Sequence, residues 1–275
     1  MVSNKVAQAM QVIHRVRQQT DTAVLYYSAG GKDGIALLDM LAGVFSRVIC
    51  VYMYLVPELD HIRPYIVWAQ RHYPNVEVRE IPHFQLDIWK ANGFFCEADP
   101  DIKPRNIGEV EEQVRQELGV HYAFSGMKGV DGYMKRMRLK TYEKRNGLIT
   151  DKGMAYPLAN WTNRDVLQYI RSRKLISPFV YVEGDVSQGF DLSLGTLLLM
   201  KYRYPADYKR TLASFPYAEK VLFDFCDGYI PKGQEKGVRS VLKSLNMEYL
   251  MPAVVRTTET ADAPPADDTP DDGNE

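Results

Sequence analysis

The sequence predicts an α/β protein with a doubly wound parallel sheet and a mainly helical C-terminal extension. Over the first 150 residues, short apolar runs alternate with segments of helical periodicity, which is typical of strands joined by crossover helices. The run at residues 48–54 is continuously apolar, as expected of a parallel strand buried on both faces. Past residue 150 the helical pattern dominates.

The predicted elements follow this alternation in chain order. We expect strands at residues 23–27, 48–54, 76–81 and 121–124. We expect helices at 6–16, 35–45, 58–72, 84–92, 108–118, 162–173, 192–202 and 207–225, the last of these interrupted by Pro216. Because parallel strands end at one edge of a sheet, the segments that follow them are the places to look for a ligand.

Composition and charge divide the chain further. The chain has 275 residues, of which 45% are hydrophobic and 25% charged, as in ordinary globular proteins. Residues 253–275 hold seven acids and one base with few large apolar groups, which predicts a disordered tail that solvates the protein or, alternatively, mimics a polyanion. The domains expected are a nucleotide-binding domain at 1–185, a helical cap at 186–252 and the acidic tail at 253–275.

The cysteines and the apolar runs predict a cytoplasmic protein with no membrane partner. Cys50, Cys96 and Cys226 form no CxxC pair, which favours a reducing compartment. The longest apolar run, residues 48–56, is far too short to span a bilayer. The five histidines show no metal-ligand spacing, and no Ser-His-Asp pattern is readable.

A glycine-rich turn between the first strand and its helix is the strongest candidate site. Its residues are Ser28, Ala29, Gly30, Gly31, Lys32, Asp33 and Gly34. Free backbone N–H groups and the helix dipole make such a position an anion site, and glycines let the backbone approach a phosphate closely. Lys32 adds a positive charge, and Asp33 either caps the helix or holds Mg²⁺. The alternative is a plain glycine turn without a ligand.

A second candidate segment is the basic run from Lys128 to Arg145, which follows the strand at 121–124. It holds seven bases against two acids. A solvated helical face is the usual interpretation of such a run, but its start at a strand end favours a second group of phosphate ligands. The candidates there are Gly126, Lys128, Asp131, Arg136 and Arg138.

These segments resemble the phosphoadenylyl-sulfate (PAPS) reductase family, within the PP-loop adenine-nucleotide hydrolases. The glycine turn resembles the family's Ser-Gly-Gly-Lys-Asp-Ser loop, with Ala29 and Gly34 in place of the two serines, so the loop is degenerate. Ser28 stands one residue early. The segment from Gly126 is similar to the family's Gly-x-Arg-x-x-Glu-Ser motif, with Lys128 in place of the arginine. Residues 156–170 and 176–181 resemble two further family blocks.

The resemblance implies a Rossmann-like, PP-loop type fold that takes ATP or PAPS, and we expect Mg²⁺ with it. In the implied mechanism the turn and Lys32 hold the phosphates and Asp33 holds Mg²⁺. Lys128, Arg136 and Arg138 stabilise the charge that develops at the α-phosphate. Lys32, Asp33, Lys128 and Arg136 are therefore the predicted catalytic residues. In the block at 156–170 we expect Trp161, Val166 and Ile170 to be core residues rather than ligands.

Cysteine usage narrows the activity within the family. Sulfonucleotide reductases carry a nucleophilic cysteine near the C-terminus, and no cysteine follows Cys226. Cys226 stands among apolar residues, a setting that raises a thiol pKa, so thioredoxin-dependent PAPS reduction is not expected. Three scattered cysteines also argue against an iron–sulfur cluster.

Three functions therefore stay open at this point. The first is a nucleotide-dependent transferase or adenylating enzyme of the ATP pyrophosphatase type, acting on an unidentified acceptor. The second is a catalytically inactive nucleotide-binding module, because the loop lacks two hydroxyl ligands. The third is a nucleic-acid-binding protein that uses the run 128–145, with Tyr133 and Tyr142 as stacking groups.

Overall fold

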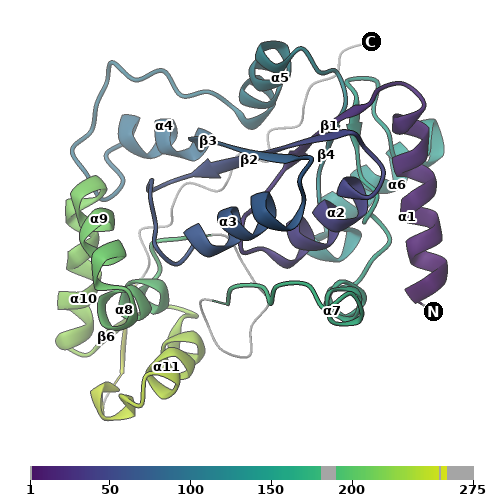
Figure 1. Cartoon of the computed structure of the whole chain (residues 1–275). Coiled ribbons are helices and arrows are strands. Elements are labelled where there is room, and N and C mark those ends of the chain that lie inside the picture. The colour runs from purple at the N-terminus through teal and green to yellow at the C-terminus, as the bar shows by residue number, and fades with distance from the viewer. Residues whose placement is uncertain (1, 181–189, 254, 259–275) are drawn as a thin grey trace. The chain divides into compact units, whose positions relative to one another are not determined.

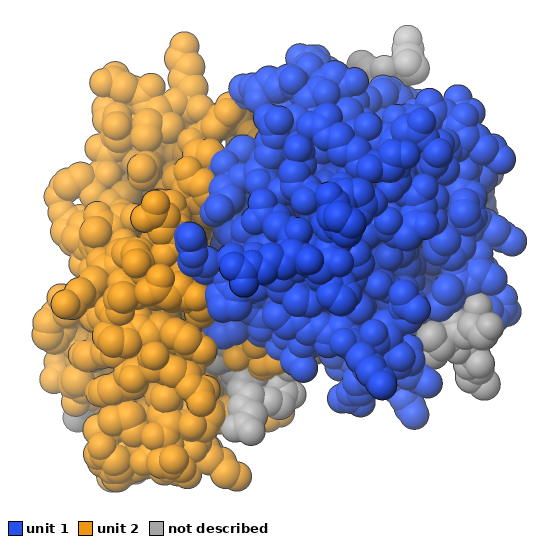
Figure 2. Space-filling model, in the orientation of Figure 1, with its two compact units in different colours: residues 1–53, 62–81, 112–179 blue, residues 54–61, 82–111, 180–275 orange. Residues whose placement is uncertain are grey.

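A computed structural model describes residues 2–180, 190–253 and 255–258 of the chain (Figure 1). The predicted domain boundary at residue 185 and most of the predicted acidic tail at 253–275 lie outside the described residues. Two compact units are present, coloured in Figure 2. Unit 1 comprises residues 1–53, 62–81 and 112–179, and unit 2 comprises residues 54–61, 82–111 and 180–275.

The first unit contains a five-stranded parallel sheet in the order β3-β2-β1-β4-β5, which confirms the predicted doubly wound α/β fold. Its strands are β1 (Thr22–Tyr26), β2 (Arg47–Tyr54), β3 (Val76–Pro82), β4 (Ala123–Phe124) and β5 (Met154–Ala155). β1 is the central strand, with Val24 opposite Ala123 and Leu25 opposite Cys50. The central residues of β1 and β2 are fully buried, as their continuous apolar runs predict.

Helices cover both faces of this sheet. Figure 1 shows α2 and α3 on one side of the strands and α5 on the other. α2 contacts both β1 and α7, and α1 contacts α7 and β5. The helices are α1 (Val2–Arg17), α2 (Lys32–Ala42), α3 (Arg63–His72), α5 (Ile107–Leu118, which begins in the second unit), α6 (Tyr133–Asn146) and α7 (Asn163–Ser172), with a 3₁₀ turn η1 (Gly129–Asp131).

The second unit is mainly helical, as predicted for the C-terminal extension. Its elements are α4 (Phe84–Ala91), α8 (Leu194–Arg203), α9 (Pro205–Ser214), η2 (Pro216–Ala218), α10 (Glu219–Cys226), β6 (Tyr229–Pro231), α11 (Glu235–Ser244), η3 (Glu248–Leu250) and β7 (Arg256–Thr258). A buried hydrogen bond links its segments, since Nδ1 of His61 lies 2.7 Å from Oδ2 of Asp207. The backbone N–H groups of Asp60 and His61 donate to the same carboxylate.

The structure departs from the predicted elements in a few places. α3 begins at Arg63 rather than near residue 58, and its second residue, Pro64, is well suited to a first helical turn. The pairing of β4 covers two residues instead of four. β5 is equally short and has no alternating pattern, so no strand was predicted there. None of the helices in the described residues has the length and apolar character that a membrane span needs.

Candidate functional site

The candidate site lies where the strand order of the sheet reverses. In the order β3-β2-β1-β4-β5, the chain winds one way from β1 to β2 and the other way from β4 to β5. Ligands of open α/β sheets bind outside the carboxyl ends of the strands at such a reversal. The glycine turn at 28–34 follows β1, and the segment 125–132 follows β4. The fold thus brings together the two segments that the sequence singled out.

The glycine turn leaves the N-terminus of α2 without a side-chain cap. Gly31 is the N-cap of this helix and supplies no side-chain acceptor to the first-turn N–H groups, which lie outside the helical hydrogen-bond ladder. A Cβ atom on Gly31 would lie 2.2 Å from Oγ of Ser28. Glycine at this position therefore lets the Ser28 hydroxyl sit directly against the helix N-terminus. The turn thus presents amides and a hydroxyl on one surface, as an anion site requires.

Ala29 holds the turn in an uncommon backbone conformation. Its φ is 35°, in the left-handed region that L-residues seldom occupy, and its side chain is fully buried. Such conformations cost roughly 1–3 kcal/mol and persist where the surroundings enforce them. The surroundings here include Tyr27 and Gly30, which are also buried.

A direct contact and an ion pair join the two loops. A Cβ on Gly126 would lie 2.9 Å from Cβ of Asp33, so glycine is needed for this approach. Nζ of Lys128 lies 2.6 Å from Oδ2 of Asp33 and 3.1 Å from Oδ1 of Asp131. Nζ of Lys32 lies 3.2 Å from the same Oδ2 of Asp33. The Lys128 side chain has no exposed surface and that of Lys32 has 5%.

We name the four residues Lys32, Asp33, Lys128 and Asp131 the ionic cluster. Two ammonium groups face two carboxylates, so its formal charge is zero. Oδ1 of Asp33 is buried and has no hydrogen-bond partner among the described residues. Oδ2 carries both lysine contacts, so Oδ1 is the atom left for a further ligand. The role of Asp33 as a Mg²⁺ ligand stays a prediction.

Asp131 contacts both the backbone N–H and the side-chain ammonium group of Lys128. Its Oδ2 accepts a hydrogen bond from the backbone N–H of Lys128 at 2.9 Å, which closes a capping box around η1. The next residue, Gly129, donates its N–H to the carbonyl of Ala159 at 2.9 Å. These bonds fix the chain direction after β4 and direct Lys128 inward toward α2. The predicted direct contact of Lys128 with a phosphate stays a prediction.

The two predicted arginines stand on α6. Arg136 is exposed, and its Cγ lies 3.5 Å from the position of a Cβ on Gly129. Arg138 is half-buried. In the part of the chain that the structure describes, neither guanidinium lies within ion-pair distance of a carboxylate. Arg136 therefore lies beside η1. The predicted role of both arginines at the α-phosphate stays a prediction.

Two aromatic residues, Tyr65 and Phe179, cover the glycine turn. The N–H of Phe179 donates to the carbonyl of Gly30 at 2.8 Å, and the hydroxyl of Tyr65 donates to the carbonyl of Ser177 at 3.0 Å. The two rings pack edge to face with centroids 6.5 Å apart. Phe179 lies in residues 176–181, which resemble a block of the PAPS reductase family. Tyr65 on α3 lies in none of the segments that carry the resemblance.

A buried carboxylate anchors α2, the helix that carries the turn. Asp39 accepts hydrogen bonds from the hydroxyls of Tyr73 at 2.8 Å and Tyr169 at 2.6 Å, and from Nε of Arg173 at 3.0 Å. Burial acts to raise the pKa of Asp39, but these hydrogen bonds outweigh it and hold the pKa below its usual value.

The block at 156–170 belongs to the core beside α2. Trp161, Val166 and Ile170 are buried, which confirms their prediction as core residues. Thr162 caps α7, and its hydroxyl accepts from the N–H of Asp165 at 3.2 Å, as the capping-box spacing predicts. These residues therefore support the site through α7 and do not line it.

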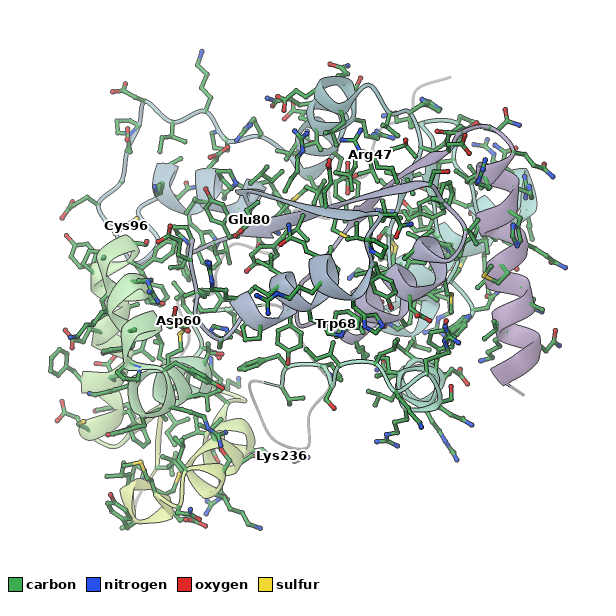
Figure 3. The ribbon with its side chains drawn as sticks, in the orientation of Figure 1. Arg47, Asp60, Trp68, Glu80, Cys96 and Lys236 are labelled. Atoms are coloured by element: carbon green, nitrogen blue, oxygen red, sulfur yellow. The ribbon has the colours of Figure 1, made fainter. Side chains whose placement is uncertain are left out.

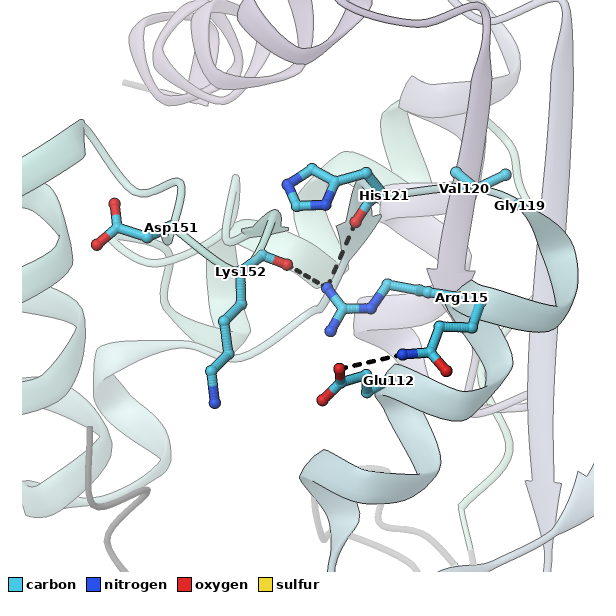
Figure 4. Close-up of a pocket in the computed structure, with 8 residues that line it drawn as sticks. Glu112, Arg115, Gly119, Val120, His121, Asp151 and Lys152 are labelled. Atoms are coloured by element: carbon cyan, nitrogen blue, oxygen red, sulfur yellow. Dashed lines mark hydrogen bonds between the residues drawn. The ribbon is translucent and has the colours of Figure 1, made fainter. Parts of the chain in front are cut away.

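A pocket of about 490 Å³ lies at the opposite end of β4 from the ionic cluster (Figure 4). It is formed where α5 ends and β4 and β5 begin. Arg115 crosses it and donates to the carbonyls of His121 and Lys152. The guanidinium thus joins main-chain groups that precede the two strands. None of the residues singled out from the sequence lines this pocket.

The cysteines lie on different elements. Cys50 is buried in β2, Cys96 is half-buried after α4 (Figure 3), and Cys226 is exposed at the end of α10. The apolar setting predicted for Cys226 is wrong, because the apolar neighbours Leu222 and Phe225 face the core while the thiol does not. Among the described residues, no group of three or more His, Cys, Asp or Glu side chains is placed to hold a metal.

Comparison with known proteins identifies the family. The phosphoadenosine phosphosulfate reductase domain matches residues 23–202, more than half of the chain, so the chain belongs to this family. Adenosine 5'-phosphosulfate reductase of Lysinibacillus sphaericus (strain C3-41) is 22% identical over 181 residues, which cover 61% of this chain and 71% of the relative.

One comparison with a solved structure bears on the cofactor prediction. U34-tRNA thiolase NcsA from Methanococcus maripaludis, with its [4Fe-4S] cluster, covers 89% of this chain and 88% of its own at 13% identity, with a TM-score of 0.43. The expectation that no iron–sulfur cluster accompanies this chain is therefore withdrawn. It rested on cysteine spacing along the sequence, which does not determine which groups a fold brings together or which cofactors a related protein holds.

Proposed function

We propose that this chain binds an adenine nucleotide at the ionic cluster and uses it in a nucleotide-dependent transfer or adenylation. The observation that carries this proposal is the junction of two loops after β1 and β4, made by the 2.6 Å contact between Lys128 and Asp33. Structural ion pairs are common, but this one lies at the strand-order reversal beside an uncapped helix N-terminus.

Each residue of the site has a proposed role. The amides of the turn from Ala29 to Gly34 and the hydroxyl of Ser28 bind phosphate oxygens, and Lys32 supplies the nearby positive charge. Gly30, Gly31 and Gly126 permit the close approach of backbone to ligand. Lys128, Arg136 and Arg138 stabilise charge that develops at the α-phosphate, and Asp131 orients Lys128.

The chemistry proposed is positioning and electrostatic stabilisation without a covalent nucleophile. A buried, preorganised set of charges costs little reorganisation when charge develops on the substrate. The acceptor is not identified by the site. Ala29 and Gly34 replace two hydroxyl side chains of the related loops. The Ser28 hydroxyl, which lies beside Gly31, is proposed to compensate for one of them.

Thermal unfolding with ATP, PAPS and AMP at millimolar concentration tests the binding step. A ligand of the native state raises the melting temperature by mass action, so ATP or PAPS is expected to raise it and Lys32→Ala to reduce the shift. Lys236→Ala, on the exposed surface of α11 (Figure 3), is the matched control. No shift with any of the three nucleotides contradicts the proposal. Pyrophosphate release from ATP then distinguishes an enzyme from a binding module.

A further inference from the structure

The exposed surface of α6 is unusual in its charge. The helix carries six bases and one acid, Glu143, which accepts from Nδ2 of Asn160 at 2.9 Å. Within residues 2–180, 190–253 and 255–258, no carboxylate forms an ion pair with any of the six bases. They are Lys135, Arg136, Arg138, Lys140, Lys144 and Arg145. Exposed helices usually intersperse charges of both signs.

One face of α6 combines these bases with large apolar side chains. Tyr133, Met137, Lys140 and Lys144 have the spacing i, i+4, i+7, i+11, which places them in one stripe about 16 Å long. The side chains of Tyr133 and Met137 are 68% and 45% exposed, and both lysines are exposed. Met134, beside the stripe, is 61% exposed.

The other side of α6 packs against the rest of the unit. Leu139 is buried, and Tyr142 stacks on Tyr156 with ring centroids 5.5 Å apart and planes at 10°. Neither contact involves Tyr133 or Met137, which stay largely exposed on the stripe. By comparison, Lys220 on α10 pairs with Asp224 one turn later at 2.7 Å, as an ordinary solvated lysine does. The α6 stripe has no such compensation.

We propose that the α6 stripe binds a single-stranded nucleic acid. Lys140 and Lys144 pair with backbone phosphates, and Tyr133, flanked by methionines, stacks on a base. Only an unstacked base offers its face to a tyrosine, so the chemistry selects a single strand over a duplex. A membrane surface fits less well, because lipid-binding helices separate an apolar face from a basic one, whereas here both kinds of side chain share one stripe.

The stripe also lies close to the ionic cluster within the same unit. α6 follows η1, whose last residue, Asp131, holds Lys128 against Asp33. The inference goes beyond the proposed function and stands without it, since strand binding requires no nucleotide.

Fluorescence anisotropy with labelled single-stranded RNA, single-stranded DNA and a duplex of the same length tests the inference on the full chain over a range of salt. Single strands are expected to bind more tightly than the duplex. Lys140→Ala/Lys144→Ala should lower the slope of log K against log salt by about 1.4, from roughly 0.7 per phosphate contact. Tyr133→Ala should weaken binding about 5- to 150-fold, and Tyr133→Phe should restore it.

Matched controls keep the test specific. Lys236→Ala/Lys243→Ala removes the same charge from α11, and Tyr249→Ala removes another exposed tyrosine, 76% exposed. Both should leave strand binding unchanged. The inference is overturned if the control pair weakens binding as much as Lys140→Ala/Lys144→Ala, or if the duplex binds more tightly than the single strands. It is also overturned if anionic vesicles or an acidic peptide bind more tightly than the strands. The ATP-induced thermal shift, measured in the same variants, shows separately whether the proposed function fails.

Discussion

The basic run from Lys128 to Arg145 divides into two regions with opposite environments. Lys128 has no exposed side-chain surface and contacts Asp33 and Asp131 at 2.6 and 3.1 Å. Lys140 and Lys144 on α6 are exposed and form no ion pair with the described residues. Charges that are adjacent in sequence therefore serve different purposes. The buried one organises two loops of the fold, and the exposed ones are available to a partner.

The largest difference between the two regions is expected in stability. Lys128→Ala leaves two carboxylates without their shared counter-charge, and breaking a buried pair costs roughly 3–5 kcal/mol. We expect about 3 kcal/mol, the lower end, because Asp33 and Asp131 are 23% and 27% exposed. Lys140→Ala should stay within about 0.5 kcal/mol of the parent. Urea unfolding measures both, and equal values would remove the distinction.

The close contact of the loops gives the next largest effect. Gly126→Ala places a Cβ 2.9 Å from Cβ of Asp33, and overpacking of this kind costs about 1–3 kcal/mol. The control is Gly43→Ala, where the nearest atom to the new Cβ lies at 3.7 Å and φ is −76°. Urea midpoints that fall equally for the two variants would show that the loops are not tightly joined.

The pKa of a buried histidine, His83, makes the stability of the fold depend on pH. Burial lowers the pKa of His83 to about 4, while Nδ1 of its ring accepts from the N–H of Gln85 and caps α4. Between pH 6.5 and about 4 the unfolded chain binds a proton that the folded chain does not. Stability should therefore fall as the pH drops through this window.

Substitution isolates the contribution of this histidine. His83→Asn keeps a capping acceptor and removes the titration, so the loss of stability between pH 6.5 and 4 should become shallower. Part of the loss should remain, because burial also lowers the pKa of His61, against the opposing effect of Asp207. The exposed His121→Asn serves as the control for the substitution itself. An unchanged slope in His83→Asn, measured by urea unfolding at several pH values, would contradict this explanation.

The smallest effect is expected at Cys226. Its thiol is exposed, so Cys226→Ser should change stability by less than about 0.5 kcal/mol. We also predict no thioredoxin-coupled reduction of PAPS or adenosine 5'-phosphosulfate by the parent protein. Turnover of either compound by the parent that disappears in Cys226→Ser would show that this cysteine is a nucleophile.

The sequence was sufficient for the parts of the molecule that depend on local pattern. The continuous apolar run predicted β2, the alternation of elements predicted the sheet, and the Thr162/Asp165 spacing predicted the start of α7. β5 was missed because two paired residues carry no periodicity. The interaction between Asp33 and Lys128 joins residues far apart in the chain, so spacing alone did not reveal the buried ion pair.

The candidate site shows the same limit. The glycine turn and the residues after β4 were identified from their place after strands, whereas Tyr65 and the anchoring Asp39 were not. Their contacts come from tertiary packing of α3 and α7, which no local signal records.

Lys32 and Lys128, held together through Asp33, are expected to act on one bound nucleotide. Calorimetric titration of ATP into the parent, Lys32→Ala, Lys128→Ala and the double variant tests this, at a temperature where all four are folded. Each single substitution should weaken binding by about 1.5–3 kcal/mol, and the double variant should depart from additivity because the residues share a partner. If Lys128→Ala binds ATP like the parent, or the two effects are strictly additive, the ionic cluster is not the nucleotide site.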